Sequence, residues 1–320
     1  MLERLLVSKE GKNAEIDRPM TFHFDFFKTH DGLSIRWGYV ARTASNARGT
    51  VLFLNGRTEY MDKYAEVFEA LSERGYEVYS LDWRGQGLSE RLLADSQKGH
   101  VDDFEDYLRD LEQLLAIVQS RCAPPPFILL GHSMGGHLAL RFLERHLDRF
   151  SRGVLSAPMI DIQVPTYLPR RLLRWLVDAA LRRGRSDRYV FGSGPFNDRD
   201  RRFEGNPLTS DRARFQRNVD MIQRDPRLAL GGVTFGWLSA ALHSIDYLNA
   251  PVFARTLVVP LLMVTAGEDR IVSRRAQDAF CHKAPDCRRL NIEGARHEIL
   301  VETDPRRAQF WQAFDDFTAN

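Results

Sequence analysis

The spacing of hydrophobic and polar positions changes several times along the chain, and each pattern predicts a different element. Apolar and polar side chains alternate over residues 22–26 and 33–40 on either side of a turn, which predicts an antiparallel hairpin. Strands of a parallel sheet are predicted at 50–54, 77–81, 127–130, 153–157, 261–265 and 288–292. Helical periodicity is found at 61–75, 103–120, 137–146, 274–282 and 305–317.

Strands that alternate with helices predict an α/β fold with a doubly wound, mostly parallel sheet. The alternation stops between residues 158 and 250, where no buried strand is evident, and it resumes afterwards. A connection of that length inside a compact domain is unusual, so it is predicted to be a functional helical cap. The expected organisation is a first part of the core at 1–157, the cap at 158–250 and a second part of the core at 251–320.

Composition narrows the class of protein. A chain of 320 residues can build a core without disulfides or metals, and its three cysteines (Cys122, Cys281 and Cys287) form no C-x-x-C motif. They are interpreted as buried or idle thiols, and no metal site and no cofactor are expected. The first twenty residues are expected to form a polar arm without a secretion signal, and no run reaches the roughly 18 apolar residues of a membrane span. A cytoplasmic protein is predicted.

Charge is distributed unevenly. The net charge of the chain is only +2, which argues against nucleic acid as the main partner. Residues 158–250 contain fifteen Arg, no Lys and ten acidic residues, so the positive charge belongs to the predicted cap. Within it, residues 167–183 have leucines on one helical side and arginines mostly on the other. Such a helix can contact the inner face of an anionic membrane, cover an apolar pocket, or pack on the core with a solvated outer face.

A serine bracketed by glycines lies between a predicted strand and a predicted helix. The segment Gly131-His132-Ser133-Met134-Gly135-Gly136 follows the strand at 127–130. A tight strand-to-helix turn leaves no room for side chains two residues before and after its central residue. The serine hydroxyl then lies at a helix N-terminus, where the helix dipole favours negative charge. Ser133 is therefore predicted to be a nucleophile.

A serine nucleophile needs a base, and the base needs an orienting carboxylate. In this topology the chain order is serine, acid, histidine. Asp269 follows the strand ending at residue 265, and His297 follows the strand ending at residue 292. Both positions are at the carboxyl ends of strands, where open α/β sheets place their sites. Glu268 and Asp161 are alternatives for the acid.

Two backbone N–H groups are expected to stabilise the oxyanion of the tetrahedral intermediate, each worth about 3 kcal/mol. One belongs to Met134, the residue after the nucleophile. The other is assigned to Arg57, because the loop Asn55-Gly56-Arg57 follows an early strand. An ordinary turn at Asn55-Gly56 is the alternative interpretation.

Four segments together resemble the α/β-hydrolase family of serine hydrolases that includes monoacylglycerol lipases and bacterial lysophospholipases. They are Asp82–Ser89, Gly131–Gly136, Gly267–Val272 and Gly294–Leu300. In the cap, Asn206–Ser210 and Gly231–Leu238 are similar to the bacterial lysophospholipase branch. The resemblance implies an α/β-hydrolase fold, a triad of Ser133, Asp269 and His297, and an acyl-ester substrate.

The chain departs from this family at one position. Members usually have His-Gly at the oxyanion loop and a glutamate three residues after the glycine. Here Asn55 replaces the histidine, whereas Gly56 and Glu59 are kept. The backbone donor tolerates this change, but the substrate preference need not be the same. Lys63 lies one helical turn after Glu59 and is placed to pair with it.

The predicted function is release of fatty acid from monoacyl lipids through an acyl-enzyme. A positively charged cap suits a phosphate-bearing head group, so lysophospholipid ranks ahead of monoacylglycerol. Four apolar residues of the cap are candidates to line an acyl-chain pocket, although a small hydrophobic core accounts for them equally well: Trp175, Phe235, Trp237 and Leu238.

Other functions are compatible with the same residues. Short-chain carboxylesterases, thioesterases, acyltransferases and cofactor-free haloperoxidases use this constellation, whereas epoxide hydrolases and dehalogenases have Asp in place of Ser133. A non-catalytic ligand receptor on this fold is a further alternative, but it would not need all three triad residues.

Overall fold

The computed structural model describes residues 22–163 and 169–319, so the predicted N-terminal arm lies outside the described residues. Its centre is an eight-stranded sheet with the order β1-β2-β4-β3-β5-β6-β7-β8. The strands are β1 (Phe22–Lys28), β2 (Ser34–Val40), β3 (Gly49–Leu54), β4 (Tyr76–Leu81), β5 (Phe127–His132), β6 (Arg152–Ser156), β7 (Leu261–Ala266) and β8 (Cys287–Ile292). The β1-β2 hairpin is antiparallel, β2 joins β4 antiparallel, and all other pairs are parallel. The predicted mostly parallel sheet is confirmed.

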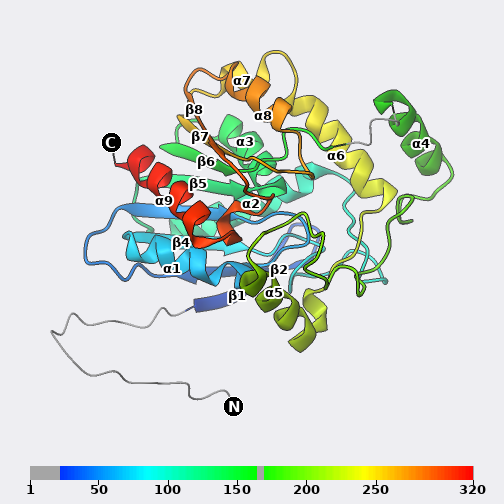
Figure 1. Ribbon diagram of the computed structural model, residues 1–320, viewed down its shortest axis with the longest axis horizontal. Coiled ribbons are helices and arrows are strands. Elements are labelled where there is room, and N and C mark those ends of the chain that lie inside the picture. Colours follow the sequence, from blue (N-terminus) through cyan, green and yellow to red (C-terminus); the bar gives the residue numbers. More distant parts are fainter. Residues whose placement is uncertain (1–21, 164–168, 320) are drawn as a thin grey trace.

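Helices cover both faces of the sheet (Figure 1). Successive residues of a strand point to opposite faces, so Val51 and Phe53 of β3 join one core cluster while Leu52 and Leu54 join the other. The first cluster includes α1 (Ala65–Glu73), which follows the short helix η1 (Met61–Tyr64), and α9 (Asp304–Thr318). The second includes α2 (Phe104–Ser120), α3 (Met134–Arg145), α7 (Phe253–Thr256) and α8 (Arg274–Cys281). Burial on both faces accounts for the apolar character of the central strands.

The segment between β6 and α7 forms helices. These are α4 (Arg170–Arg182), α5 (Arg212–Arg224), η2 (Pro226–Leu228) and α6 (Phe235–Leu248). The N-terminal N–H groups of α5 and α6 are capped by the side chains of Asp211 and Thr234. In Figure 1, α4 lies at the periphery of the molecule and α5 lies near α1. The basic helix predicted at 167–183 corresponds to α4, although residues 167 and 168 lie outside the described range.

The interpretation of the cysteines as buried or idle thiols is wrong for Cys281 and Cys287, although it holds for Cys122. Cys281 at the end of α8 and Cys287 at the start of β8 form a disulfide, with a Cα–Cα distance of 5.3 Å. The connection of five residues between this helix and this strand brings the two side chains together, and no recognised motif has that spacing. Cys122 is a free thiol and is exposed.

Candidate active site

Ser133 lies at the turn between β5 and α3. Its backbone has φ of 53° and ψ of −116°, a conformation that a residue with a side chain rarely adopts. The turn is held because the Ser133 N–H donates to the Ser156 carbonyl at 3.0 Å. A Cβ atom at Gly131 would lie 2.5 Å from the Gly135 carbonyl oxygen, and one at Gly135 would lie 2.1 Å from that of Leu54. Only glycine fits at these positions, which explains the spacing found in the sequence.

The structure brings Ser133, His297 and Asp269 together in one chain of hydrogen bonds. His297 Nε2 lies 2.9 Å from Ser133 Oγ, and His297 Nδ1 lies 2.7 Å from Asp269 Oδ2. The other carboxylate oxygen of Asp269 accepts backbone N–H groups of Ile271 and Val272 at 2.8 and 3.0 Å. Burial alone would raise the pKa of Asp269, but these hydrogen bonds outweigh it and lower the pKa. The carboxylate is therefore ionised where it orients the imidazole.

The two alternative acids lie elsewhere. The side chain of Glu268 is exposed, and its backbone N–H donates to the Ala295 carbonyl at 2.8 Å. Asp161 pairs with Arg170 at the start of α4. The geometry therefore favours Asp269 as the partner of His297.

The loop after β3 lies against the start of α3, because the Leu54 and Asn55 carbonyls closely approach Gly135. Asn55 is fully buried, and its amide donates to the Leu81 carbonyl at 3.0 Å, which anchors the loop to the end of β4. Gln86 Nε2 donates to the Gly56 carbonyl at 2.8 Å. The backbone N–H groups of Arg57 and Met134 donate to no acceptor within the described residues, so both are available to an oxyanion.

A buried cluster of charged side chains lies next to the loop after β3. Lys63 Nζ lies 2.9 Å from Glu59 and 2.6 Å from Glu298, the residue after His297. The predicted Glu59–Lys63 pair is thus confirmed, and Glu298 is a third member that sequence reasoning missed. Burial would raise the pKa of Glu59, but the attraction of Lys63 and a hydrogen bond from Tyr64 help to lower it to about 2. Burial lowers the pKa of His132 to about 4, so this histidine is neutral at pH 7.

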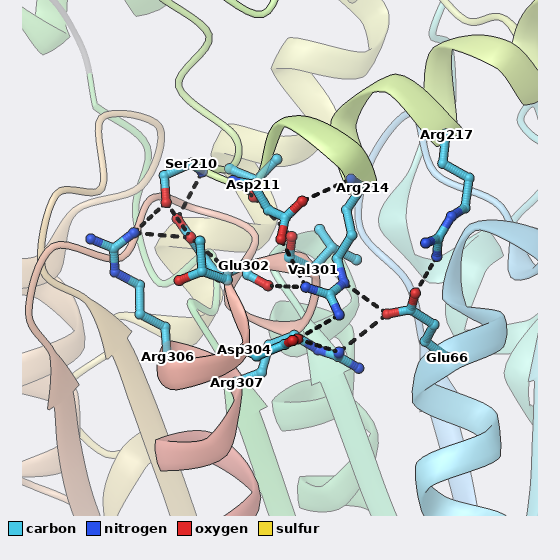
Figure 2. A network of polar contacts seen from close by, with 12 residues as sticks. Glu66, Ser210, Asp211, Arg214, Arg217, Val301, Glu302, Asp304, Arg306 and Arg307 are labelled. Atoms are coloured by element: carbon cyan, nitrogen blue, oxygen red, sulfur yellow. Dashed lines mark hydrogen bonds and ion pairs between the residues drawn. The ribbon is translucent and has the colours of Figure 1, made fainter.

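The loop that carries His297 is held by residues 206–214. The His297 and Glu298 N–H groups donate to the carbonyls of Pro207 and Leu208 at 3.3 and 2.8 Å. Figure 2 shows the adjoining network, in which Arg214 of α5 contacts Asp304 at 2.7 Å. Arg214 also pairs with Glu66 of α1 at 2.7 Å. The Asn206–Ser210 motif therefore has a structural role, because it connects the segment between β6 and β7 to the histidine loop.

Glu302 is the most buried acid of this network. It is inaccessible to solvent, and its carboxylate accepts the Ser210 hydroxyl at 2.6 Å and the N–H groups of Ser210, Arg296 and Thr303 at 2.9 to 3.0 Å. Burial would raise the pKa of Glu302, but these donors outweigh it and lower the pKa below its usual value. Arg306 Nη1 donates to the same carboxylate at 3.1 Å, so five donors converge on it beside the histidine loop.

Replacing Glu302 with glutamine is expected to destabilise the fold at pH 7 by about 2–3 kcal/mol, because an amide cannot accept all of these donors. A lowered folded-state pKa means that the carboxylate stabilises the fold above its unfolded-state pKa. This contribution is lost as the pH falls through the folded-state value. The difference in the free energy of unfolding between the wild type and E302Q, measured in urea, should therefore shrink as the pH falls below about 4. Glu69→Gln, at an exposed position of α1, is the control; a constant difference across the pH range would contradict the prediction.

The four candidates for an acyl-chain pocket do not line one cavity. Trp175 is 59% exposed on α4 and, with Phe235, lines a hollow of about 460 Å³. Leu238 is buried in the small cluster between α4 and α6. Trp237 packs instead in the main core, with its ring centroid 5.5 Å from that of Phe104. The amphipathic spacing predicted that these apolar side chains make contacts inside the protein. It could not predict whether they line a pocket or pack in a core.

Within residues 22–163 and 169–319, no cluster of three or more His, Cys, Asp or Glu side chains is placed to bind a metal ion. No helix of this range combines the length and the apolar character needed to cross a bilayer.

Comparison with known proteins places the chain in a family. The family model described as serine aminopeptidase, S33 matches residues 45–304. Lysophospholipase L2 of Escherichia coli (strain K12) is 36% identical over 299 residues, which cover 90% of this chain and 84% of that relative. The probable lysophospholipase L2 of Haemophilus influenzae is 29% identical over 285 residues, 89% of this chain and 88% of the relative.

Solved structures agree on the fold. The crystal structure of a soluble variant of monoglyceride lipase from Saccharomyces cerevisiae, in complex with a substrate analog, matches with a TM-score of 0.73 at 19% identity. The match covers 97% of this chain and 98% of that one. The predicted α/β-hydrolase fold is confirmed. The chain belongs to the serine aminopeptidase S33 family of α/β-hydrolases, and it is a hydrolase.

Proposed function

We propose that this chain releases fatty acid from monoacyl glycerolipids, with lysophospholipids ahead of monoacylglycerols, through nucleophilic attack by Ser133. The observation that carries the proposal is the hydrogen-bonded chain from Ser133 through His297 to Asp269 at the N-terminus of α3. A serine with a base on its hydroxyl and a carboxylate on that base is the arrangement that acyl transfer requires.

In the acylation step, His297 Nε2 accepts the hydroxyl proton while Ser133 Oγ attacks the ester carbonyl. The N–H groups of Arg57 and Met134 stabilise the resulting oxyanion. Collapse of the tetrahedral intermediate breaks the ester C–O bond, and His297 returns its proton to the departing glycerol oxygen. The acyl group is then an ester of Ser133.

Deacylation repeats these steps with water. His297 removes a proton from water, the hydroxide attacks the acyl-enzyme, and the proton returns to Ser133 Oγ as the fatty acid leaves. Asp269 stays ionised throughout and stabilises the imidazolium formed in each half-reaction.

The substrate class is supported by the relatives and by charge. Two of the relatives that align over most of this chain are lysophospholipases by name. Residues 158–250, which we propose to act as a cap, carry an excess of arginine that suits an anionic head group.

We also propose that the cap contacts the inner face of an anionic membrane through α4 and the turn after it. Trp175 and Phe191 are 59% and 82% exposed. Arg171 and Arg185 are exposed beside them and form no ion pair within the described residues. Exposed aromatic side chains among unpaired cations fit the boundary between head groups and acyl chains.

Vesicle binding tests the membrane contact. Arg185→Gln is expected to weaken binding to phosphatidylglycerol-containing vesicles about fivefold, because one cation near such a surface contributes about 1 kcal/mol. Trp175→Ala should weaken it further, whereas Val258→Ala, at a position that is 61% exposed on another part of the molecule, should not. Equal binding by all variants in a flotation assay would show that α4 does not contact the membrane.

Fatty-acid release from a matched panel tests the function. The panel contains palmitoyl lysophosphatidylcholine, palmitoyl lysophosphatidylethanolamine, 1-palmitoylglycerol and p-nitrophenyl butyrate. We expect the two lysophospholipids to be cleaved fastest. A much faster reaction with 1-palmitoylglycerol would reverse the ranking, and activity on the short ester alone would make the chain a general carboxylesterase.

A further inference from the structure

We propose that a cavity beside the loop after β3 binds the phosphate of a lysophospholipid head group, with the Arg57 guanidinium as its main cation. The cavity has a volume of about 500 Å³ and lies between Arg57, Lys63 and residues 192–207 and 230–232. We call it the Arg57 cavity. The inference rests on the proposed function, because it assigns part of that substrate to a particular place.

The Arg57 cavity adjoins the groups that act on the ester. Arg57 carries both the backbone N–H assigned to the oxyanion and the side chain that lines the cavity. Glu298, which follows His297, lines its other side. In a lysophospholipid the glycerol backbone separates the ester from the phosphate by only a few bonds. A substrate with its ester at Ser133 therefore directs its phosphate towards this region.

The Arg57 guanidinium lacks a counter-ion. Its Nη1 donates to the Gly231 carbonyl at 3.0 Å, and its Cζ lies 5.8 Å from the ring centroid of Trp237. Among the described residues, no carboxylate oxygen lies within 4.0 Å of it. Burial lowers the pKa of Arg57, and interactions with Tyr107 and Asp200 offset this only in part. A partly buried cation without a carboxylate partner at close range is costly, and an anionic ligand group reduces that cost.

The other charged side chains that line the cavity leave its net charge positive. Two of its carboxylates are already paired, Glu298 with Lys63 at 2.6 Å and Glu204 with Arg212 at 2.6 Å. Asp200 accepts the backbone N–H of Asn197, and its charge partly offsets that of Arg57. The remaining lining cations, Arg199 and Arg202, are exposed at the rim and form no ion pair in the described part of the chain. Guanidinium groups bind phosphate oxygens through paired N–H donors, so the set suits a phosphate.

The lining also argues against an acyl chain in this cavity. Apart from Phe196, Phe215 and a few aliphatic residues, it consists of charged side chains, amides, two hydroxyl side chains and five glycines. An alkyl chain gains little free energy by moving from water onto such a polar surface. The exposed backbone and cations instead favour a polar head group.

The test compares two substrates that share one acyl chain, palmitoyl lysophosphatidylglycerol and 1-palmitoylglycerol. Arg57→Gln should lower kcat/KM for the lysophospholipid at least about tenfold more than for the monoacylglycerol, because one charge-assisted contact is lost. The selectivity ratio is the readout, since a change at the oxyanion loop can lower both rates. Arg57→Lys should give an intermediate ratio, and Arg224→Gln, an exposed arginine at the end of α5, should keep the wild-type ratio. An unchanged ratio in Arg57→Gln would overturn the proposal.

A binding measurement separates this inference from the proposed function. Glycerophosphoglycerol, which has no acyl ester, is titrated calorimetrically into the wild type and into Arg57→Gln. The wild type should bind it at least about tenfold more tightly than the variant, whichever lipid the enzyme cleaves. Equal binding, or no binding to the wild type, would overturn the cavity assignment alone. Inorganic phosphate should bind at least about tenfold more weakly; equal affinity would indicate a site for free phosphate instead.

Discussion

Replacing Ser133 with alanine is expected to lower kcat for fatty-acid release by at least about 10⁴-fold, because the variant has no nucleophile for His297 to activate. The hydroxyl lies 2.9 Å from His297 Nε2, and the strained φ of 53° keeps it at the apex of the turn. The measurement is steady-state release of palmitate from palmitoyl lysophosphatidylcholine at pH 7.

Ser156→Ala is a matched control for this variant. Ser156 is a buried serine at the end of the neighbouring strand, and its hydroxyl has no hydrogen-bond partner within the described residues. Its backbone carbonyl, which the substitution keeps, accepts hydrogen bonds from the Ser133 N–H and from His132 Nδ1, both at 3.0 Å. This variant should retain activity within about twofold, since the removed group is unpaired. Loss of activity in both variants, or in neither, would contradict the role given to Ser133.

Asp269→Asn is expected to lower kcat by about 10⁴-fold while leaving the fold intact, because an amide facing His297 Nδ1 favours the wrong tautomer. In the wild type this nitrogen lies 2.7 Å from Asp269 Oδ2. The amide oxygen can still accept the backbone N–H groups of Ile271 and Val272, which preserves the loop. The measurement is kcat at pH 7, together with thermal unfolding.

Glu268→Gln is the control for the acid. Glu268 is the sequence neighbour of Asp269, but its side chain is exposed and contacts neither His297 nor Ser133 within the described residues. Its substitution should change kcat by less than about twofold, as is usual for surface positions. A larger effect at Glu268 than at Asp269 would mean that the acid has been misassigned.

The sheet, and the positions of Ser133, Asp269 and His297 at its edge, could be predicted because the sequence patterns that indicate them are local. A buried strand shows as an apolar run, and the turn at Ser133 excludes side chains at Gly131 and Gly135 through contacts with adjacent backbone. Asp269 and His297 follow strands that the pattern had already located. Parallel strands end at the same edge of a sheet, so the topology itself predicts that these loops meet.

Other features depend on contacts between distant residues, and no local pattern encodes them. Glu302 accepts hydrogen bonds from Ser210, 92 positions away, so its role appears only after folding. The pair Cys281–Cys287 was missed because disulfide connectivity cannot be deduced from spacing. For Trp237 the sequence left a pocket and a small hydrophobic core equally open, since apolar helix positions look alike in either environment, and the ring packs in the main core.

The role of Ser133 as the nucleophile is tested most directly by labelling the enzyme with a fluorophosphonate and mapping the labelled peptide by mass spectrometry. The reagent reacts with a serine hydroxyl only where a base activates it. We expect one adduct, on Ser133, that is absent from Ser133→Ala and strongly reduced in Asp269→Asn. An adduct on a different residue, or an unlabelled enzyme that still releases fatty acid, would contradict this role.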